Sequence, residues 1–300
     1  MEVHQLRYFC AVAQEGSFTR AARQQHIAQP SLSQQIRKLE DELGARLFDR
    51  LGRTVKLTPF GETFLPRVKA ILRDMENAKQ EIEEMSGQER GRLVIGSIPT
   101  IAPYLLPLCL TSFTSQFPQI QVSVVEEITS ELLDRLHKGT IDLALLALPV
   151  AEGPYDCYEL FRERLHLVVP ENHRLASRPG ARLKQVEQDP FLLLKEGHCF
   201  RENTLAACGR ARLEPNVIFE SGQFSTLLAM VAAGMGVSVV PEMAIEPRAG
   251  CSFVPLIDEA AYRRVGVVQF KHHFRSRGQV AFVRHLKANV RPRALSRSAS

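Results

Sequence analysis

The order of apolar and polar positions in the first third of the chain predicts three short helices. The first helix carries apolar residues at helical spacing and stops at Gly16: Leu6, Phe9, Cys10 and Ala13. Ser17 then suits the N-cap of a second helix, FTRAARQQ. Pro30 is expected to start a third helix, in which Ser31 and Gln34 form a capping box. The apolar face of this third helix is predicted to hold Leu32, Ile36, Leu39 and Leu43.

The second and third helices, joined by the short turn HIAQ, match helix-turn-helix geometry, in which the second helix of the pair enters the major groove of DNA. The polar face of the third helix displays Ser33, Gln34 and Arg37, which suit base edges and phosphates. The stretch DRLGRTVKLTPFG predicts a two-stranded wing with Gly52 at its tip and three basic side chains available to phosphates: Arg50, Arg53 and Lys56. A helical bundle with a solvated polar face fits the same periodicity equally well.

Beyond the predicted wing, apolar residues recur at alternating spacings of four and three: Phe64, Val68, Ile71, Met75, Ala78, Ile82 and Met85. This spacing is typical of a coiled-coil seam, which one helix cannot bury on itself. A partner helix from a second copy is the economical solution, with packing on the helix's own domain as the alternative. The polar stretch SGQERGR, residues 86–92, predicts a linker.

From Leu93 onward, short β-branched runs alternate with helical stretches, which predicts parallel strands with crossover helices. The alternation starts again after RERLHLVVP, residues 162–170, so two α/β lobes are expected. The basic tail RPRALSRSAS, residues 291–300, has little apolar surface to bury and is expected to be disordered.

Composition narrows the class of protein. The 45% apolar content can fill two or three domains, no apolar run approaches ~18 residues, and the N-terminus lacks signal-peptide features, so a cytoplasmic protein without a membrane span is expected. The net charge of +5 is unevenly distributed along the chain: residues 266–300 hold eight Lys or Arg and no acidic residue, which makes the C-terminal segment basic. Residues 1–58 carry +3, which is compatible with a phosphate-binding surface.

Six cysteines scattered over 300 residues do not form a secreted disulfide framework, and no CxxC pair is present. Zinc-ribbon and thioredoxin-like sites are therefore excluded, and neither a metal nor a cofactor is expected. Four cysteines are expected by default to have no chemical role: Cys10, Cys109, Cys157 and Cys251. The remaining two, Cys199 and Cys208, are the first and last residues of the segment CFRENTLAAC, which follows a Gly-His pair.

Residues 28–50, AQPSLSQQIRKLEDELGARLFDR, followed by LTPFGETF and preceded by AVAQEGSFTRAA, resemble the N-terminal domain of LysR-type transcriptional regulators. The resemblance implies an α/β chain with an N-terminal winged helix-turn-helix (1–58), a dimerisation helix (59–88) and a two-lobed sensor like periplasmic binding proteins (89–290). Lobe I is expected at about 91–162 and 269–290, and lobe II at about 163–268. The resemblance also implies promoter DNA and RNA polymerase as partners, self-association as a dimer or tetramer, and DNA contacts by Ser31, Ser33, Gln34, Arg37, Arg50 and Arg53.

The stretch GSIPTIAPYLLP places Ser97 and Thr100 between a strand and a helix N-terminus, where hydroxyls and free amides can hold a small polar molecule. Thr129 occupies the equivalent position one unit later. Simple helix capping explains both threonines equally well.

The segment LLLKEGHCFRENTLAAC, residues 192–208, closely resembles the sensing loop of the OxyR group, the LysR-type regulators that respond to hydrogen peroxide. This resemblance implies that Cys199 is the peroxidatic thiol and Cys208 the resolving thiol of a reversible disulfide. It also implies a peroxide site with Thr100, Thr129, His198, Arg201 and a family arginine that falls at Arg263 or Arg264, of which Arg264 is selected. Lys195 departs from the acidic residue expected before the glycine.

The chemistry also follows from the residues. A thiolate attacks the O–O bond of a peroxide, so the ordinary thiol pKa of ~8.5 has to be lowered. We expect the N-terminus of the helix that Cys199 opens, together with His198 and Arg201, to lower it. Nine helical residues span ~13.5 Å, whereas the Cα atoms of a disulfide lie within about 7 Å. The helix therefore has to unwind before Cys199 and Cys208 can bond.

The resulting hypothesis is a DNA-binding activator of antioxidant genes, reset by thiol reductants such as glutaredoxin or thioredoxin, and not an enzyme. Two alternatives stay open at this point. One is a LysR-type regulator that binds a small organic effector between its lobes, with incidental cysteines. The other is a peroxidase, although such an enzyme needs neither the DNA-binding head nor the coiled-coil helix.

Overall fold

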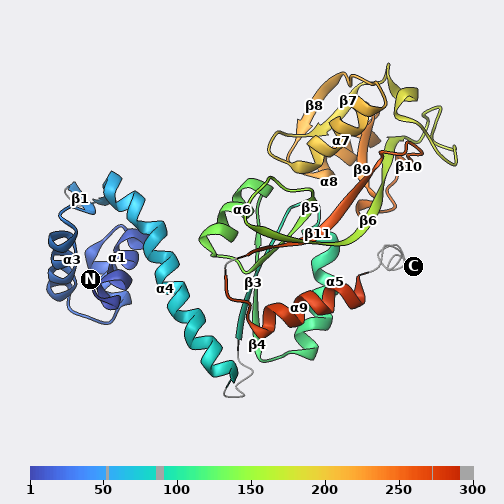
Figure 1. Cartoon of the computed structure of the whole chain (residues 1–300). Coiled ribbons are helices and arrows are strands. Elements are labelled where there is room, and N and C mark those ends of the chain that lie inside the picture. The colour runs from blue at the N-terminus through green and yellow to red at the C-terminus, as the bar shows by residue number, and fades with distance from the viewer. Residues whose placement is uncertain (52–53, 86–90, 272, 291–300) are drawn as a thin grey trace. The chain divides into compact units, whose positions relative to one another are not determined.

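The computed structural model describes residues 1–51, 54–85, 91–271 and 273–290. The chain divides into two compact units, Met1–Gln88 and Glu89–Ser300 (Figure 1). The predicted tail at 291–300, the tip of the wing at Gly52 and most of the predicted linker lie outside the described residues. Gly91 and Arg92, predicted as the end of that linker, instead open a strand.

The N-terminal unit contains α1 (Val3–Glu15), α2 (Phe18–Gln24), α3 (Gln29–Leu43), the antiparallel strands β1 (Phe48–Leu51) and β2 (Thr54–Leu57), and α4 (Pro59–Met85). The helix boundaries follow the expected signals. Gly16 ends α1 in the left-handed conformation (φ 57°), which a glycine adopts without steric cost. The Ser17 hydroxyl accepts a hydrogen bond from the Arg20 N–H and so caps α2.

Two details of α3 differ from the prediction. The helix begins at Gln29 with Ala28 as its N-cap, so Ser31 lies inside the first turn and the predicted capping box with Gln34 is wrong. Pro30 at the second helical position needs no N–H donor, which allows this earlier start. Leu43 is 40% exposed, because Gly44 ends the helix before this residue reaches the core.

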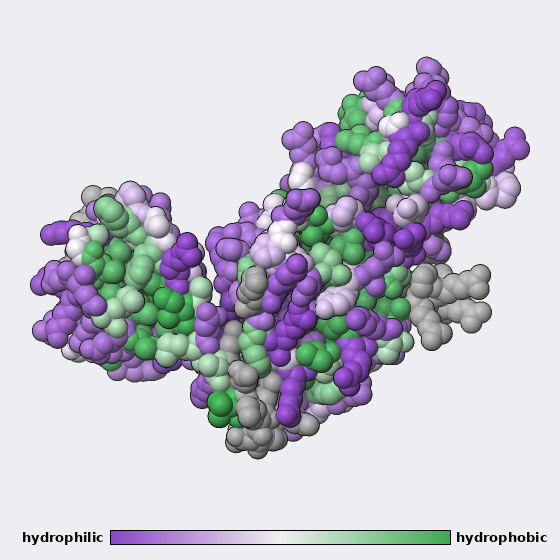
Figure 2. Space-filling model, viewed as in Figure 1, coloured by the Kyte–Doolittle hydropathy of each residue, from purple (hydrophilic) through white to green (hydrophobic). Residues whose placement is uncertain are grey.

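The apolar seam of α4 is buried at one end and exposed at the other. Val68 is fully buried in the core of the N-terminal unit, whereas Ile71, Met75 and Ile82 are 39%, 42% and 63% exposed. Figure 2 shows apolar side chains gathered on the visible face of this unit. Packing within its own unit therefore covers only the first part of the seam. The side chain of Met85 lies outside the described residues.

The second unit contains two lobes with separate hydrophobic cores. Lobe I holds β3 (Gly91–Ser97), α5 (Ala102–Gln116), β4 (Ile120–Glu126), α6 (Thr129–Lys138), β5 (Leu143–Leu148) and α9 (Arg277–Asn289). Lobe II holds β7 (Phe191–Leu194), α7 (Cys199–Arg210), β8 (Val217–Ser221), α8 (Phe224–Ala232), β9 (Ser238–Pro241), β10 (Cys251–Pro255) and the 3-10 turns Leu183–Val186 and Glu242–Ala244. Strands β3, β4 and β5 are parallel, as are β7 and β8, as the alternating pattern predicted.

Two long antiparallel strands, β6 (Tyr155–Pro170) and β11 (Tyr262–Phe270), run from one lobe to the other (Figure 1). On β6, Phe161 packs in the lobe I core and Leu165 in the lobe II core. On β11, Val265 already packs in lobe I, four residues before the predicted return at 269, because β11 pairs with β5 from Arg264 onward. The two crossing strands therefore change lobes side by side. Within the described ranges, no helix is both long and apolar enough to cross a membrane.

Candidate functional site

Cys199 is placed by the turn that joins β7 to α7. Gly197 has φ +89°, a conformation that other residues rarely adopt, and His198 is the N-cap. Cys199 is then the first helical residue, as predicted, and its side chain is half-buried against the core of lobe I. The Gly-His-Cys sequence therefore carries the thiol of a lobe II helix to the surface of lobe I.

Lobe I meets the thiol with two hydroxyl residues. Thr129 is the first residue of α6, and Thr100 lies buried between β3 and α5. The Thr129 hydroxyl is buried and has no hydrogen-bond partner of ordinary geometry in the part of the chain that the structure describes. A narrow cavity, with no room for the centre of a water-sized sphere in this conformation, lies here and is lined by Ile98, Pro99, Thr100, Ile128, Thr129, Gly197, His198 and Cys199. Ser97 does not line this cavity, and its hydroxyl is directed to the Ile98 carbonyl at 3.5 Å.

The arginine at this site is Arg263, and the selection of Arg264 is wrong. The Arg263 guanidinium is fully buried and donates to the Thr100 hydroxyl (3.0 Å) and the Thr100 carbonyl (2.9 Å). Arg264 is 35% exposed and pairs with Glu159 at 3.6 Å. Neighbouring residues of a strand point to opposite faces, so only one of the two arginines can face the site.

Burial raises the pKa of the Cys199 thiol above its ordinary value. The Thr129 hydroxyl, the charge of Arg263 and backbone groups at Ala147 and Cys199 act in the opposite direction, but burial outweighs them. The expectation that the surroundings lower this pKa is therefore wrong for this conformation. The thiol is mostly protonated at neutral pH, and the groups that favour its anion are already in place around it.

Two cations that were expected to help do not supply positive charge to the thiol. Arg201 pairs with Glu220 and donates to the Leu194 carbonyl at 3.1 Å. His198 is 7% exposed, and its burial, together with the charge of Lys195, lowers the pKa of its imidazole. His198 is therefore neutral at pH 7 and lines the cavity as an uncharged hydrogen-bonding group.

Cys208 is separated from Cys199 by the whole of α7. Its side chain is fully buried in the lobe II core, and this burial, followed by the negative charge of Asp258, raises the pKa of the thiol to about 11. Because α7 is continuous from residue 199 to residue 210, the two Cα atoms are ~13.5 Å apart. Both thiols are free in this conformation, and only an opened helix can bring them together.

The predicted DNA-contacting residues of α3 are mostly on the surface. Ser31, Gln34 and Arg37 are exposed, and Ser33 is half-buried with its hydroxyl accepting a hydrogen bond from the Gln29 amide at 2.8 Å. Arg50 belongs to β1, but its side chain lies outside the described residues, as does Arg53 entirely.

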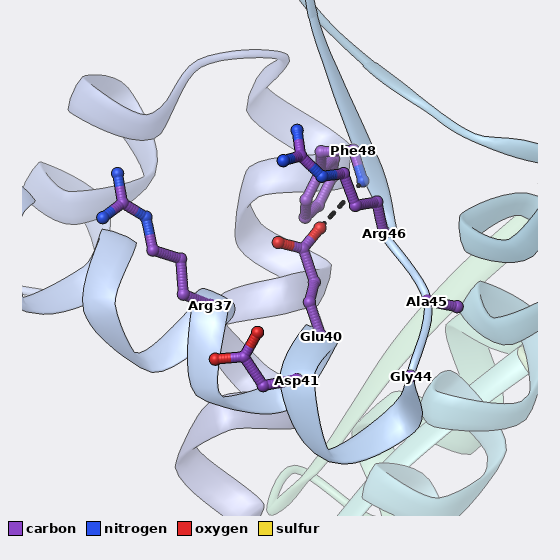
Figure 3. Close-up of a pocket in the computed structure, with 7 residues that line it drawn as sticks. All are labelled: Arg37, Glu40, Asp41, Gly44, Ala45, Arg46 and Phe48. Carbon is purple, nitrogen blue, oxygen red and sulfur yellow. Dashed lines mark hydrogen bonds between the residues drawn. The ribbon is translucent and has the colours of Figure 1, made fainter.

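A pocket at the end of α3 is lined by one further cationic residue, Arg46, that the sequence analysis did not name. The Glu40 carboxylate accepts hydrogen bonds from the N–H groups of Leu47 (2.7 Å) and Phe48 (3.2 Å), which fixes the start of β1 against α3. Figure 3 shows Arg37 and Arg46 on either side of Glu40. Arg46 is exposed and was missed by the sequence analysis, although its position directly before the buried Leu47–Phe48 pair was an available signal.

Comparison with known proteins adds a family context. Residues 3–62 match the bacterial regulatory helix-turn-helix proteins of the lysR family, and residues 86–291 match the LysR substrate binding domain. The chain is 33% identical over 276 residues to YybE of Bacillus subtilis (strain 168), an uncharacterized HTH-type transcriptional regulator, with 92% of this chain and 94% of that one covered. It is 34% identical over 271 residues to the DNA-binding transcriptional dual regulator OxyR of Escherichia coli (strain K12), with 89% of each chain covered.

Among solved structures, a variant of full-length OxyR from Pseudomonas aeruginosa matches with a TM-score of 0.75 and 30% sequence identity. The match covers 96% of this chain and 98% of that one. The chain is therefore similar to a known regulator along nearly its full length, in the head, the long helix and the two-lobed unit alike.

Proposed function

The chain belongs to the LysR family of transcriptional regulators, and from this premise we propose that it senses hydrogen peroxide through Cys199 and Cys208 and controls antioxidant genes. The proposal depends above all on one observation: the half-buried Cys199 thiol shares a small cavity with the buried hydroxyl of Thr129, which acts on that thiol and has no other partner among the described residues. The family consists of regulators, so Cys199 acts as a sensor rather than as a turnover catalyst.

The size of the cavity favours a very small effector. Sites for organic ligands usually enclose about 300–1,000 Å³, whereas the cavity at Cys199 leaves no room for the centre of a water-sized sphere in this conformation. Hydrogen peroxide needs a thiol within reach and hydrogen-bond partners for its two oxygens. The hydroxyls of Thr100 and Thr129 and the imidazole of His198 line the cavity and supply such partners. This chemistry supports peroxide over an organic effector at this position.

The reaction proceeds in two steps. The Cys199 thiolate attacks one oxygen of the peroxide, the O–O bond breaks, and the products are a sulfenic acid at Cys199 and a hydroxide that takes a proton to become water. The Cys208 thiolate then attacks the sulfenic sulfur, which forms the disulfide and releases a second water. Two thiols are oxidised and one peroxide is reduced to two waters. Two equivalents of a cellular thiol, delivered by glutaredoxin or thioredoxin, reverse the oxidation.

The second step, formation of the disulfide, requires a change in the structure of lobe II. Cys208 leaves the lobe II core and α7 unwinds, since a continuous helix holds the two sulfurs apart. Phe200 packs in that same core directly after Cys199, so unwinding also disturbs lobe II packing. A change in lobe II alters how copies of the chain pair and hence the spacing of their DNA-binding heads.

The head binds promoter DNA through the exposed face of α3. Ser31, Gln34 and Arg37 reach base edges, Ser33 supports them, and Arg50 and Arg53 contact phosphates. Arg46 adds a further phosphate contact beside the wing. The exposed part of the α4 seam is covered by α4 of a second copy, which makes the chain at least a dimer, and RNA polymerase is the expected partner at the promoter.

The decisive experiment is peptide mapping of the full-length protein after one equivalent of hydrogen peroxide. A linkage between Cys199 and Cys208 is expected, together with a changed footprint on operator DNA. Cys199→Ser abolishes both, whereas Cys157→Ser, which removes an exposed thiol on β6, leaves both unchanged. Oxidation spread over all accessible thiols, or a footprint that responds to peroxide in Cys199→Ser, rules out the proposal. Peroxide consumption that continues with thioredoxin well beyond one equivalent would instead indicate an enzyme.

A further inference from the structure

A buried ion pair joins the two crossing strands beside the redox site. Glu163 on β6 lies directly opposite Arg263 on β11, and its carboxylate accepts a hydrogen bond from the Arg263 Nε. The two side chains are 3% and 0% exposed. Removing two charges from water is costly unless they are paired and hydrogen-bonded, so such a pair requires an account of its role.

The Arg263 guanidinium makes three further contacts besides the one with Glu163. Its two terminal nitrogens donate to the hydroxyl and the carbonyl of Thr100, which belongs to lobe I. Its guanidinium lies over the ring of Phe200 at 5.2 Å, and Phe200 is the residue after Cys199 in lobe II. The guanidinium is therefore fixed between the lobes, and its charge reaches the Cys199 sulfur and favours the thiolate.

The carboxylate of Glu163 is equally constrained. Its second oxygen accepts a hydrogen bond from the backbone N–H of Met243 at 2.9 Å, in the 3-10 turn of lobe II. Both oxygens are thus occupied, one by a cation and one by a backbone donor, which fixes the orientation of the carboxylate. Glu163 does not line the cavity at Cys199 and influences that site only through Arg263.

We propose that Glu163 is a positioning residue that orients Arg263 against Thr100, offsets part of its positive charge at the Cys199 sulfur, and so sets the reactivity of the thiol. The link to peroxide rests on the proposed function, whereas the effect on the thiol itself does not. Glu163 then helps to set the threshold of the sensor: by offsetting part of the charge of Arg263 it adds to the effect of burial on the Cys199 thiol, so that low peroxide concentrations do not trigger the switch.

The direction of the effect follows from the charges around the thiol. Arginine stays protonated at every accessible pH, and the two bonds to Thr100 hold Arg263 in place when Glu163 is neutralised. The other titratable groups nearby contribute little positive charge: the pKa of His198 is lowered by burial and by Lys195, and that of Tyr104 is raised by burial and by Glu246, although Arg263 lowers it. Loss of the negative charge therefore leaves a stronger positive potential at Cys199.

The test is the pH profile of Cys199 alkylation by iodoacetamide in the full-length protein, followed for this one cysteine by peptide mass spectrometry. In Glu163→Gln the midpoint is expected to move to lower pH by about one pH unit, the order of effect that a single buried charge produces on a nearby group. Glu159→Gln is the matched control. It removes the same charge from the same strand, but from exposed pairs with Arg162 and Arg264, and its profile should match that of the unmodified protein.

Two further variants separate charge from packing. Glu163→Asp keeps the charge and shortens the side chain, so it should lower stability and leave the midpoint within a few tenths of a pH unit. The double variant Glu163→Gln with Arg263→Gln keeps a hydrogen-bonding pair but removes both charges, so its midpoint should move to higher pH than in the unmodified protein. If Glu163→Gln alone does not fold, the midpoint of the double variant tests the proposal in its place.

An unchanged or raised midpoint in folded Glu163→Gln overturns the proposal, as does an unchanged midpoint in the double variant. In a peroxide titration at pH 7, Glu163→Gln should form the 199–208 disulfide at a peroxide concentration several-fold lower. If alkylation shifts as expected but peroxide forms no disulfide even in the unmodified protein, the role of Glu163 stands and the proposed function fails.

Discussion

If Cys199 and Cys208 form a disulfide as proposed, the helix between them should control the rate of its formation, and two opposite substitutions on the exposed side of that helix test this. Ala206 is exposed in α7 between the cysteines, and Gly209 is exposed in its last turn. A Cβ built at Gly209 meets nothing within 4 Å, and its φ is not in the left-handed region, so alanine fits there without strain. Ala206→Gly should destabilise the helix, and Gly209→Ala should stabilise it.

The magnitude follows from helix propensity. Glycine costs about 1 kcal/mol relative to alanine in a helix interior, and somewhat less near an end. If unwinding is an equilibrium that precedes attack by Cys208, the disulfide rate is proportional to the opened population. A change of about 1 kcal/mol alters that population about fivefold, since 1.4 kcal/mol corresponds to tenfold. Ala206→Gly should therefore accelerate disulfide formation about fivefold, and Gly209→Ala should slow it by up to the same factor.

The assay separates the two chemical steps. After rapid mixing with one equivalent of peroxide, samples are quenched with an alkylating agent, and the sulfenic acid at Cys199 and the 199–208 disulfide are counted by mass spectrometry. Formation of the sulfenic acid should be unaffected, because it needs no unwinding. Ala288→Gly makes the same chemical change in α9, remote in sequence from the cysteines, and should affect neither step. Equal disulfide rates in both α7 variants would refute the requirement for helix opening.

Three further outcomes are expected. Thr129→Val removes a hydroxyl that acts against the effect of burial on the Cys199 thiol, so the thiol pKa rises further and alkylation at pH 7 slows by about threefold to tenfold; an unchanged pH profile would show that the hydroxyl does not reach the sulfur. Gln34→Ala should weaken operator binding by about 1–3 kcal/mol without changing the salt dependence, as measured by fluorescence anisotropy at several salt concentrations. Ile71→Lys places a charge in the exposed part of the α4 seam and should shift the sedimentation coefficient toward the monomer at micromolar protein, with Phe60→Lys, an exposed position outside the seam, as its control.

The local signals in the sequence predicted much of the fold. Helix stops and starts at Gly16 and Ser17 were correct, as were the two-stranded wing, the alternation of strands and helices, and the start of a helix at Cys199. Each of these features depends on a few neighbouring residues, since caps, glycine conformations and apolar periodicity act over one or two turns. The sequence also placed both redox-candidate cysteines on one helix, which is enough to require its unwinding.

The electrostatic environment of the site was decided only by the tertiary structure. Arg263 and Thr100 are 163 residues apart and meet because β11 pairs with β5 from Arg264 onward and with β6 at Glu163, which turns Arg263 inward and Arg264 outward. Arg201, two residues after the thiol in the sequence, is instead paired with Glu220. Burial raised the pKa that the local sequence suggested would be lowered. Desolvation and charge depend on every segment packed around a group, so they follow from contacts between distant parts of the chain and not from the pattern around the cysteine.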